Sequence, residues 1–175
     1  MSLRIRQLDE SSFENCRPGL IDLLLEAVAN GASVGFLANI DTQQADDYFD
    51  DVRRALASGA LAVWVAEEDA KVLGSVQLSL CLKPNGLNRG EVQKLLVLSS
   101  ARRRGIARLL MQQLEARARQ LKRGLLYLDT EAGSEAEHLY RALGYTTIGG
   151  LPDYACGPDG HYGANAIYYK TLFRP

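Results

Sequence analysis

The stretch from Val92 to Met111 constrains the fold of this chain most, because it predicts a buried strand, a basic turn and an amphipathic helix in direct succession. Leu95–Leu98 is wholly apolar, as is typical of a strand that is covered on both faces. From Ile106 onward, apolar residues recur at the spacing of one helix face, and polar residues take the other face. The turn between the two elements, Arg102–Gly105, consists of three arginines and a glycine. The helix therefore begins close to the end of the strand.

This turn is suited to a polyanionic ligand. A glycine at the start of a helix lets the backbone approach a ligand closely, and the first N–H groups of the helix point toward it. Cations at a helix N-terminus oppose the helix dipole, and a polyanion would offset that repulsion. An isolated basic triplet is more often a solvated charge run. Neither the Walker phosphate loop nor the three-glycine dinucleotide pattern is present. The turn thus predicts a phosphate-rich ligand outside those two classes.

Composition narrows the class of protein. A length of 175 residues, 47% hydrophobic and 23% charged, predicts one globular domain over residues 1–175. No apolar run is long enough to span a membrane and no signal-peptide pattern is present, so we expect a cytoplasmic protein without a membrane partner. A net charge of −1 argues against nucleic-acid binding. Three scattered cysteines and two histidines predict no metal site. The sequence leaves open whether the protein is a monomer or a homodimer.

The rest of the chain predicts strands and helices around this segment. Alternation with a period of two indicates strands, and helical spacing after polar caps indicates helices. Strands are expected at 3–8, 61–66, 72–80, 125–130 and 166–172, helices after Asp9–Ser12 up to Asn30, at 41–58 and, capped by Ser134, at 135–143, a turn at 67–69 and a long loop at 149–163. The helical connection before residue 125 makes that strand parallel to the central one, the only parallel pair expected.

Two segments resemble the GCN5-related N-acetyltransferase family. Arg102–Ala107 matches the family signature of Gln or Arg, two residues, Gly, one residue, then Gly or Ala. Ala136–Tyr145 is similar to a second hallmark, in which alanine, leucine-tyrosine and glycine-aromatic recur at these intervals. The resemblance covers about Leu61–Leu172. It implies a three-layer α+β fold with a mixed, mostly antiparallel sheet of about seven strands, about four flanking helices and one splayed parallel pair.

The resemblance also implies acetyl-CoA as co-substrate and no metal. In the family the pantetheine arm lies between the splayed strands, where the backbone of Leu96, Val97 and Leu98 is expected to bind it. The pyrophosphate is expected at the turn, bound by backbone N–H groups and arginine side chains. The family often has asparagine where this chain has Gly133, and Ser134 is the expected substitute. The cofactor-binding set is thus Leu96, Val97, Leu98, Arg102, Arg103, Arg104, Gly105, Ile106, Ala107, Arg108 and Ser134.

Three residues receive catalytic roles from the resemblance. Glu91 and Asp129 are expected to accept the proton of the acceptor amine, which has a pKa of about 10 and is mostly charged at neutral pH. Tyr140 is expected to protonate the leaving thiolate, and the Leu96 N–H to stabilise the oxyanion. From the residues alone, the two carboxylates suit a strand edge and a turn, and the tyrosine suits the core.

The acceptor is the least determined part of the prediction. The family lines its acceptor site with the region that contains Val34 and Phe36, although an ordinary loop with Phe36 in the core is equally compatible with the residues. The predicted function is acetyl-CoA-dependent N-acetylation of a small amino-acid-like or amine acceptor, toxins and antibiotics included. Two alternatives stay open: a protein or peptide N-acetyltransferase, and a non-catalytic acyl-CoA-binding module.

Overall fold

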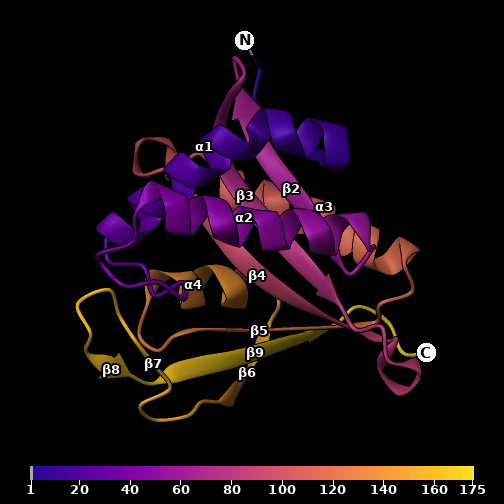
Figure 1. Ribbon diagram of the computed structural model, residues 1–175. Coiled ribbons are helices and arrows are strands. Elements are labelled where there is room, and N and C mark those ends of the chain that lie inside the picture. Colours follow the sequence, from indigo (N-terminus) through magenta and orange to yellow (C-terminus); the bar gives the residue numbers. More distant parts are fainter. Residues whose placement is uncertain (1) are drawn as a thin grey trace.

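A computed structural model describes residues 2–175 and shows a seven-stranded sheet with helices on both faces (Figure 1). Helices α1 (Glu10–Ala29) and α2 (Thr42–Ala57) cover one face, and α3 (Ile106–Gln120) covers the other. Helix α4 (Glu135–Ala142) packs on the C-terminal half of the sheet through Tyr140. Along the sheet, the strands lie in the order β1 (Arg4–Gln7), β2 (Leu61–Glu68), β3 (Lys71–Leu80), β4 (Arg89–Val97), β5 (Leu125–Glu131), β9 (Asn165–Thr171) and β6 (Thr146–Gly149).

The helix starts follow from their caps. Asp9 accepts the backbone N–H of Ser12 at 2.8 Å, and the Ser12 hydroxyl in turn accepts the N–H of Asp9. Asp41 and Gln44 form the same reciprocal arrangement at the start of α2. Such capping boxes satisfy N–H groups that have no partner within the helix. The predicted starts of both helices are confirmed.

The core lies between β2, β3 and the helices on either side. Leu61–Ala66 and Val72–Leu78 are buried without interruption, because α1 or α2 covers one face and α3 the other. Two of these residues are polar: Ser75 and Gln77 are 4% and 3% exposed. The alternation that predicted the strand β3 therefore marks an apolar face and a polar face, and α1 and α2 cover the polar one.

Within residues 2–175, the only parallel pair is β4 with β5, and it separates soon after it begins, as predicted. Arg89–Glu91 pairs with Leu125–Tyr127, and the other residues of the two strands do not pair with each other. In Figure 1, β4 rises steeply across the sheet while β5 runs almost level. The C-terminal halves of the two strands therefore do not pair with each other, and we refer to the space between their backbones as the slot.

Two local predictions were wrong, and a third was confirmed in position only. The turn expected at 67–69 is the two-residue turn Asp69–Ala70, in which both residues have positive φ, as in a type I′ hairpin. The loop expected at 149–163 contains the short strands β7 (Ala155–Cys156) and β8 (Tyr162–Gly163), which are too brief to show a periodic pattern. Ser134 occupies the predicted N-cap position of α4, but its side chain makes no capping hydrogen bond, and Glu137 accepts the nearby Gly133 N–H at 2.7 Å.

Candidate active site

Strand β4 contains a β-bulge opposite Val76 of β3. The two neighbours of Val76 pair with Gln93 and Leu96. Two residues of β4, Lys94 and Leu95, therefore stand against one residue of β3. Lys94 has a φ of 49°, in the left-handed region that a residue with a side chain seldom adopts. A bulge bends its strand, so this one accounts for the divergence of β4 from β5.

The bulge also decides which backbone groups face the slot. Leu98 donates its N–H to the carbonyl oxygen of Leu73 on β3 at 2.9 Å, and Leu96 pairs with Ser75 in the same ladder. Backbone groups point alternately to the two sides of a strand, so Leu96 and Leu98 face β3 and Val97 faces the slot. Of the three backbone partners expected for the cofactor, only Val97 is thus directed at the slot. The N–H of Leu96, the expected oxyanion donor, is directed at β3.

The turn before α3 leaves space for a ligand. Gly105 caps the helix with a φ of 77°, and a Cβ built on it would meet no atom within 4 Å. Packing therefore does not require glycine here, but the left-handed conformation favours it. Buried Ile106 fixes the start of the helix, and Ala107 is half-buried. Arg102, Arg103 and Arg108 are exposed around it. Exposed arginines at a helix N-terminus with open space beside its glycine are an arrangement that suits a polyanion.

Arg104 differs from its neighbours, because it is engaged within the protein. Its guanidinium binds both carboxylate oxygens of Glu68 at the end of β2, at 2.9 and 3.3 Å. This pairing holds the pKa of Glu68 below its usual value. On the other side of the turn, Ser99 donates its hydroxyl to Glu26 of α1 at 2.6 Å. The turn is thus held at both ends. Arg104 fixes the position of the turn, and its guanidinium is already bound to Glu68.

Tyr140 has a buried ring and a free hydroxyl. The residue is 6% exposed, and its ring lies 5.8 Å from that of Tyr145 and 6.1 Å from that of Tyr168, centroid to centroid. Within residues 2–175, no group hydrogen-bonds its hydroxyl. Burial, together with the negative charge of Asp129, raises the pKa of Tyr140 to about 12. The phenol therefore stays protonated at neutral pH.

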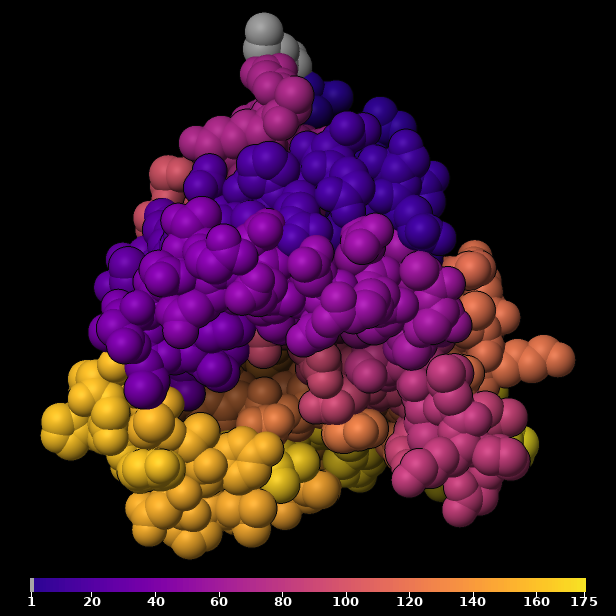
Figure 2. Space-filling view, viewed as in Figure 1, coloured from indigo at the N-terminus to yellow at the C-terminus, as the bar shows by residue number. Residues whose placement is uncertain are grey.

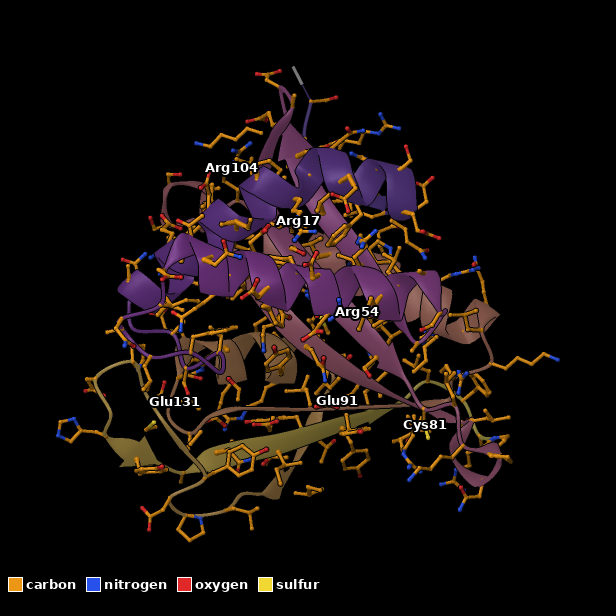
Figure 3. The ribbon with its side chains drawn as sticks, viewed as in Figure 1. Arg17, Arg54, Cys81, Glu91, Arg104 and Glu131 are labelled. Atoms are coloured by element: carbon orange, nitrogen blue, oxygen red, sulfur yellow. The ribbon has the colours of Figure 1, made fainter. Side chains whose placement is uncertain are left out.

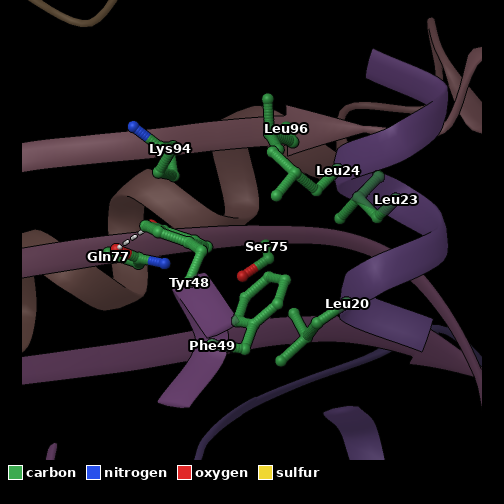
Figure 4. A pocket seen from close by; sticks show the side chains of 9 residues that line it. All are labelled: Leu20, Leu23, Leu24, Tyr48, Phe49, Ser75, Gln77, Lys94 and Leu96. Carbon is green, nitrogen blue, oxygen red and sulfur yellow. Dashed lines mark hydrogen bonds between the residues drawn. The ribbon is translucent and has the colours of Figure 1, made fainter. Parts of the chain in front are cut away.

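Lys94 lies with the predicted carboxylates, and sequence reasoning missed it. Burial lowers the pKa of the Lys94 ammonium, while Asp129 and Glu91 raise it through their charge. The ammonium also lies 5.7 Å from the centre of the Tyr48 ring, and the Tyr48 hydroxyl donates to Gln77 at 3.2 Å (Figure 4). The signal in the sequence was a lysine directly before the apolar run Leu95–Leu98. Because Asp129 acts on both Lys94 and Tyr140, these groups belong to one site.

The two candidate acceptor contacts, Val34 and Phe36, lie in the loop between α1 and α2, which packs against Tyr48. Phe36 packs edge-on against Tyr48 at 5.4 Å, and Val34 is half-buried against the core. The loop that carries them contacts the turn between β7 and β8, where the Ala38 N–H donates to the carbonyl oxygen of Pro158 at 3.0 Å. Figure 2 shows the surface hollowed between the violet atoms of α2 and the yellow C-terminal atoms, above atoms with the orange of β5 and α4. The acceptor side of the site is therefore bounded by two loops.

The two ends of the site are well separated. Figure 3 shows Arg104 near the top of the view and Glu91 low in it, where β4 and β5 begin to part. The slot thus has a cationic turn at one end and the Glu91, Lys94 and Asp129 cluster at the other.

Across the described residues, no group of three or more His, Cys, Asp and Glu side chains could hold a metal ion. No helix in that part of the chain is long and apolar enough to cross a membrane.

Comparison with known families matches residues 23–145 to the model of the Acetyltransferase (GNAT) family, which is most of the chain. The chain belongs to this family. A relative of this acetyltransferase, the uncharacterized N-acetyltransferase YjgM of Escherichia coli (strain K12), is 30% identical over 142 residues. The match covers 81% of this chain and 82% of that protein. The enzyme class and the fold expected from the resemblance are therefore confirmed.

Solved structures agree with the acetyltransferase fold. The putative acetyltransferase yncA from Salmonella typhimurium, solved with its cofactor acetyl-CoA, superposes with a TM-score of 0.80 at 18% identity, over 100% of this chain and 96% of that one. A ribosomal-protein-alanine N-acetyltransferase from Brucella melitensis superposes with a TM-score of 0.78 at 25% identity, over 97% and 99% of the two chains.

Proposed function

We propose that this acetyltransferase transfers the acetyl group of acetyl-CoA to the amine of a small, amino-acid-like acceptor. The observation that carries the proposal is the cluster of Glu91, Asp129 and Lys94 at the acceptor end of the slot. Two carboxylates attract an ammonium group and can take its proton. Acceptor-side segments of the chain also resemble those of the tabtoxin resistance protein, a family member that acetylates a β-lactam amino-acid toxin. These segments are Gly31–Phe36, Lys83–Arg89, Glu91–Leu95 and Leu128–Ser134.

The slot and the turn fit acetyl-CoA. The open space at Gly105 and the exposed Arg102, Arg103 and Arg108 suit the pyrophosphate, and the backbone of Val97 suits the pantetheine amides. Ser134 is half-buried at the start of α4, near enough to Thr130 for a 3.4 Å contact between hydroxyls, and remains a candidate for the cofactor arm. When bound, acetyl-CoA supplies the acetyl group as an activated thioester.

Different residues of this chain are assigned to the separate steps of the proposed reaction. Glu91 and Asp129 accept the ammonium proton of the acceptor, directly or through water. The N–H of Leu95, within the bulge, replaces that of Leu96 as the donor to negative charge on the carbonyl oxygen, since Leu96 faces β3. Tyr140 holds its proton at neutral pH and donates it to the leaving sulfur. Lys94 stands beside the two carboxylates and is considered below.

A protein N-acetyltransferase is the second candidate, because of the likeness to the Brucella melitensis enzyme. The loop contacts argue against it. Ser33 and Ala38 of the α1–α2 loop meet Cys156 and Pro158, which closes one side of the acceptor region. A polypeptide needs an open groove, whereas an amino acid does not.

An acceptor panel tests the choice between these functions. Purified protein is incubated with acetyl-CoA and amino acids, simple amines or peptides, and released thiol is measured with a thiol reagent. We expect turnover with amino acids and little with peptides. Acetylation of peptide N-termini or lysines alone would contradict the proposed function and support the second candidate, a protein N-acetyltransferase. Binding of acetyl-CoA without turnover on any acceptor would indicate the non-catalytic module.

Removing either carboxylate charge should impair proton removal. We expect Glu91→Gln and Asp129→Asn each to lower kcat/KM about 10- to 100-fold. The pH at which the rate rises should also increase, because the amine must then lose its proton to solvent. A pH profile of kcat/KM measures both effects. Glu10→Gln removes an exposed carboxylate in the first turn of α1, away from every segment assigned to the site, and this control should behave as the wild type. An unshifted profile in both variants would remove these carboxylates from the mechanism.

A further inference from the structure

Lys94 is a half-buried cation without a direct partner. Among the described residues, no hydrogen bond joins its ammonium to another group, and no carboxylate lies within 4.0 Å of it. Burial of an unpaired charge is unfavourable, so such a group is retained where a ligand supplies the missing counter-charge. Most other buried or half-buried cations of this protein, such as Lys170 with Glu115 at 2.7 Å, do have a partner.

The position of Lys94 within the bulge directs it to the acceptor. Its side chain lies over the Tyr48 ring, on the same side of the sheet as the polar pair Tyr48 and Gln77 (Figure 4). A Cβ built on Gly35, in the acceptor loop, would lie 3.9 Å from the ammonium nitrogen. The loop glycine thus leaves room next to the cation, on the acceptor side of the site.

The charges around Lys94 match those of a zwitterion. Glu91 and Asp129 are suited to an ammonium group, and Lys94 is suited to a carboxylate. An α-amino acid carries both groups on one carbon, so a single small molecule satisfies both parts of the cluster. A simple amine or polyamine would leave the lysine unpaired and would add a cation next to it.

We propose that Lys94 binds the carboxylate of the acceptor and thereby selects free amino acids over amines that lack a carboxylate. This inference rests on the proposed function and names the residue that sets its substrate class. Lys94 is then a specificity-determining residue, and proton removal stays with Glu91 and Asp129. Tyr48 and Gln77, joined to each other, hold the wall against which the lysine lies.

The experiment compares free amino acids with their carboxamides. The twenty proteinogenic L-amino acids and the corresponding amides are assayed with acetyl-CoA, and the best pair is kept for variants. Lys94→Met removes the charge at nearly equal length, and Lys94→Arg keeps it. Lys122→Met is the matched control, because Lys122 also has positive φ, at 57°, but lies exposed at the end of α3.

We expect the wild type to prefer the acid, and Lys94→Met to lower kcat/KM for the acid about 10- to 100-fold, as loss of a hydrogen bond to a charged group implies. The same variant should change the amide less than about 3-fold, and Lys94→Arg and Lys122→Met should keep the preference for the acid. Circular dichroism verifies that each variant is folded.

Two outcomes would overturn the inference while leaving the proposed function intact. One is a wild type that acetylates amides or simple amines as well as acids. The other is an equal loss for acid and amide in Lys94→Met, which would assign the lysine to proton transfer or to structure. Absence of turnover with every small acceptor would instead overturn the proposed function, and the inference with it.

Discussion

Gly105→Asp is expected to abolish the binding of acetyl-CoA while the protein stays folded. A side chain at this position would project into open space, since no protein atom lies within 4 Å of a built Cβ. That space adjoins the arginine turn, so a carboxylate there would stand against the pyrophosphate. Like charges brought together at an interface cost several kcal/mol, which corresponds to a loss of affinity of about 100-fold or more. Isothermal titration calorimetry measures the affinity.

A matched variant separates charge at the turn from the general effect of the substitution. Gly59 has a φ of 76°, close to the 77° of Gly105, and a Cβ built on it also meets no atom within 4 Å. Gly59→Asp therefore introduces the same residue in the same conformation, between α2 and β2, and should leave affinity unchanged. If Gly105→Asp binds acetyl-CoA as well as Gly59→Asp does, the cofactor does not lie at this turn.

Tyr140→Phe is expected to reduce turnover about 100-fold or more, the usual effect of losing a positioned general acid. The ring packing is kept, and because the hydroxyl has no partner within residues 2–175, its removal leaves no buried group unpaired. Affinity for acetyl-CoA should change little. With a pKa of about 12, Tyr140 should cause no loss of kcat at any pH below about 11.

Tyr145 supplies the control for this prediction. Its ring lies 5.8 Å from that of Tyr140, and its hydroxyl is also buried without a partner. Tyr145→Phe removes a comparable phenol from the same aromatic group and should leave kcat unaffected. Equal turnover in the two variants would show that Tyr140 serves only in the core.

Much of the fold was predictable because its signals are local. The caps at Asp9 and Asp41 and the strand–turn–helix segment around Gly105 each reflect interactions within a few residues of sequence. The single parallel pair followed from the length of the connection. What could not be predicted are features set by distant partners. Arg104 resembles its neighbours in sequence and differs from them only because Glu68 lies opposite it in the fold.

The same limit applies to the site. Lys94 adopts a left-handed conformation that the neighbouring residues do not predict. The resulting bulge shifts by one residue the alternation of backbone groups along β4. The resemblance to the family assigned Leu96, Val97 and Leu98 alike to the slot, whereas the ladder directs Leu96 to β3. The burial of Gln77 likewise depends on a distant partner, because Tyr48 of α2 lies over it and hydrogen-bonds to it.

The short pairing of β4 with β5 has a consequence for the stability of the protein. The sheet is joined at its middle by only three pairs, between Arg89–Glu91 and Leu125–Tyr127. At the proposed site, acetyl-CoA would take the place of the missing part of a strand and link both halves of the sheet. By mass action, a ligand at 100 times its Kd adds about 2.7 kcal/mol to the free energy of unfolding. The lifetime of this protein against proteases in a cell is thus expected to follow the concentration of acetyl-CoA, so that a cell short of the cofactor would also retain less of the enzyme.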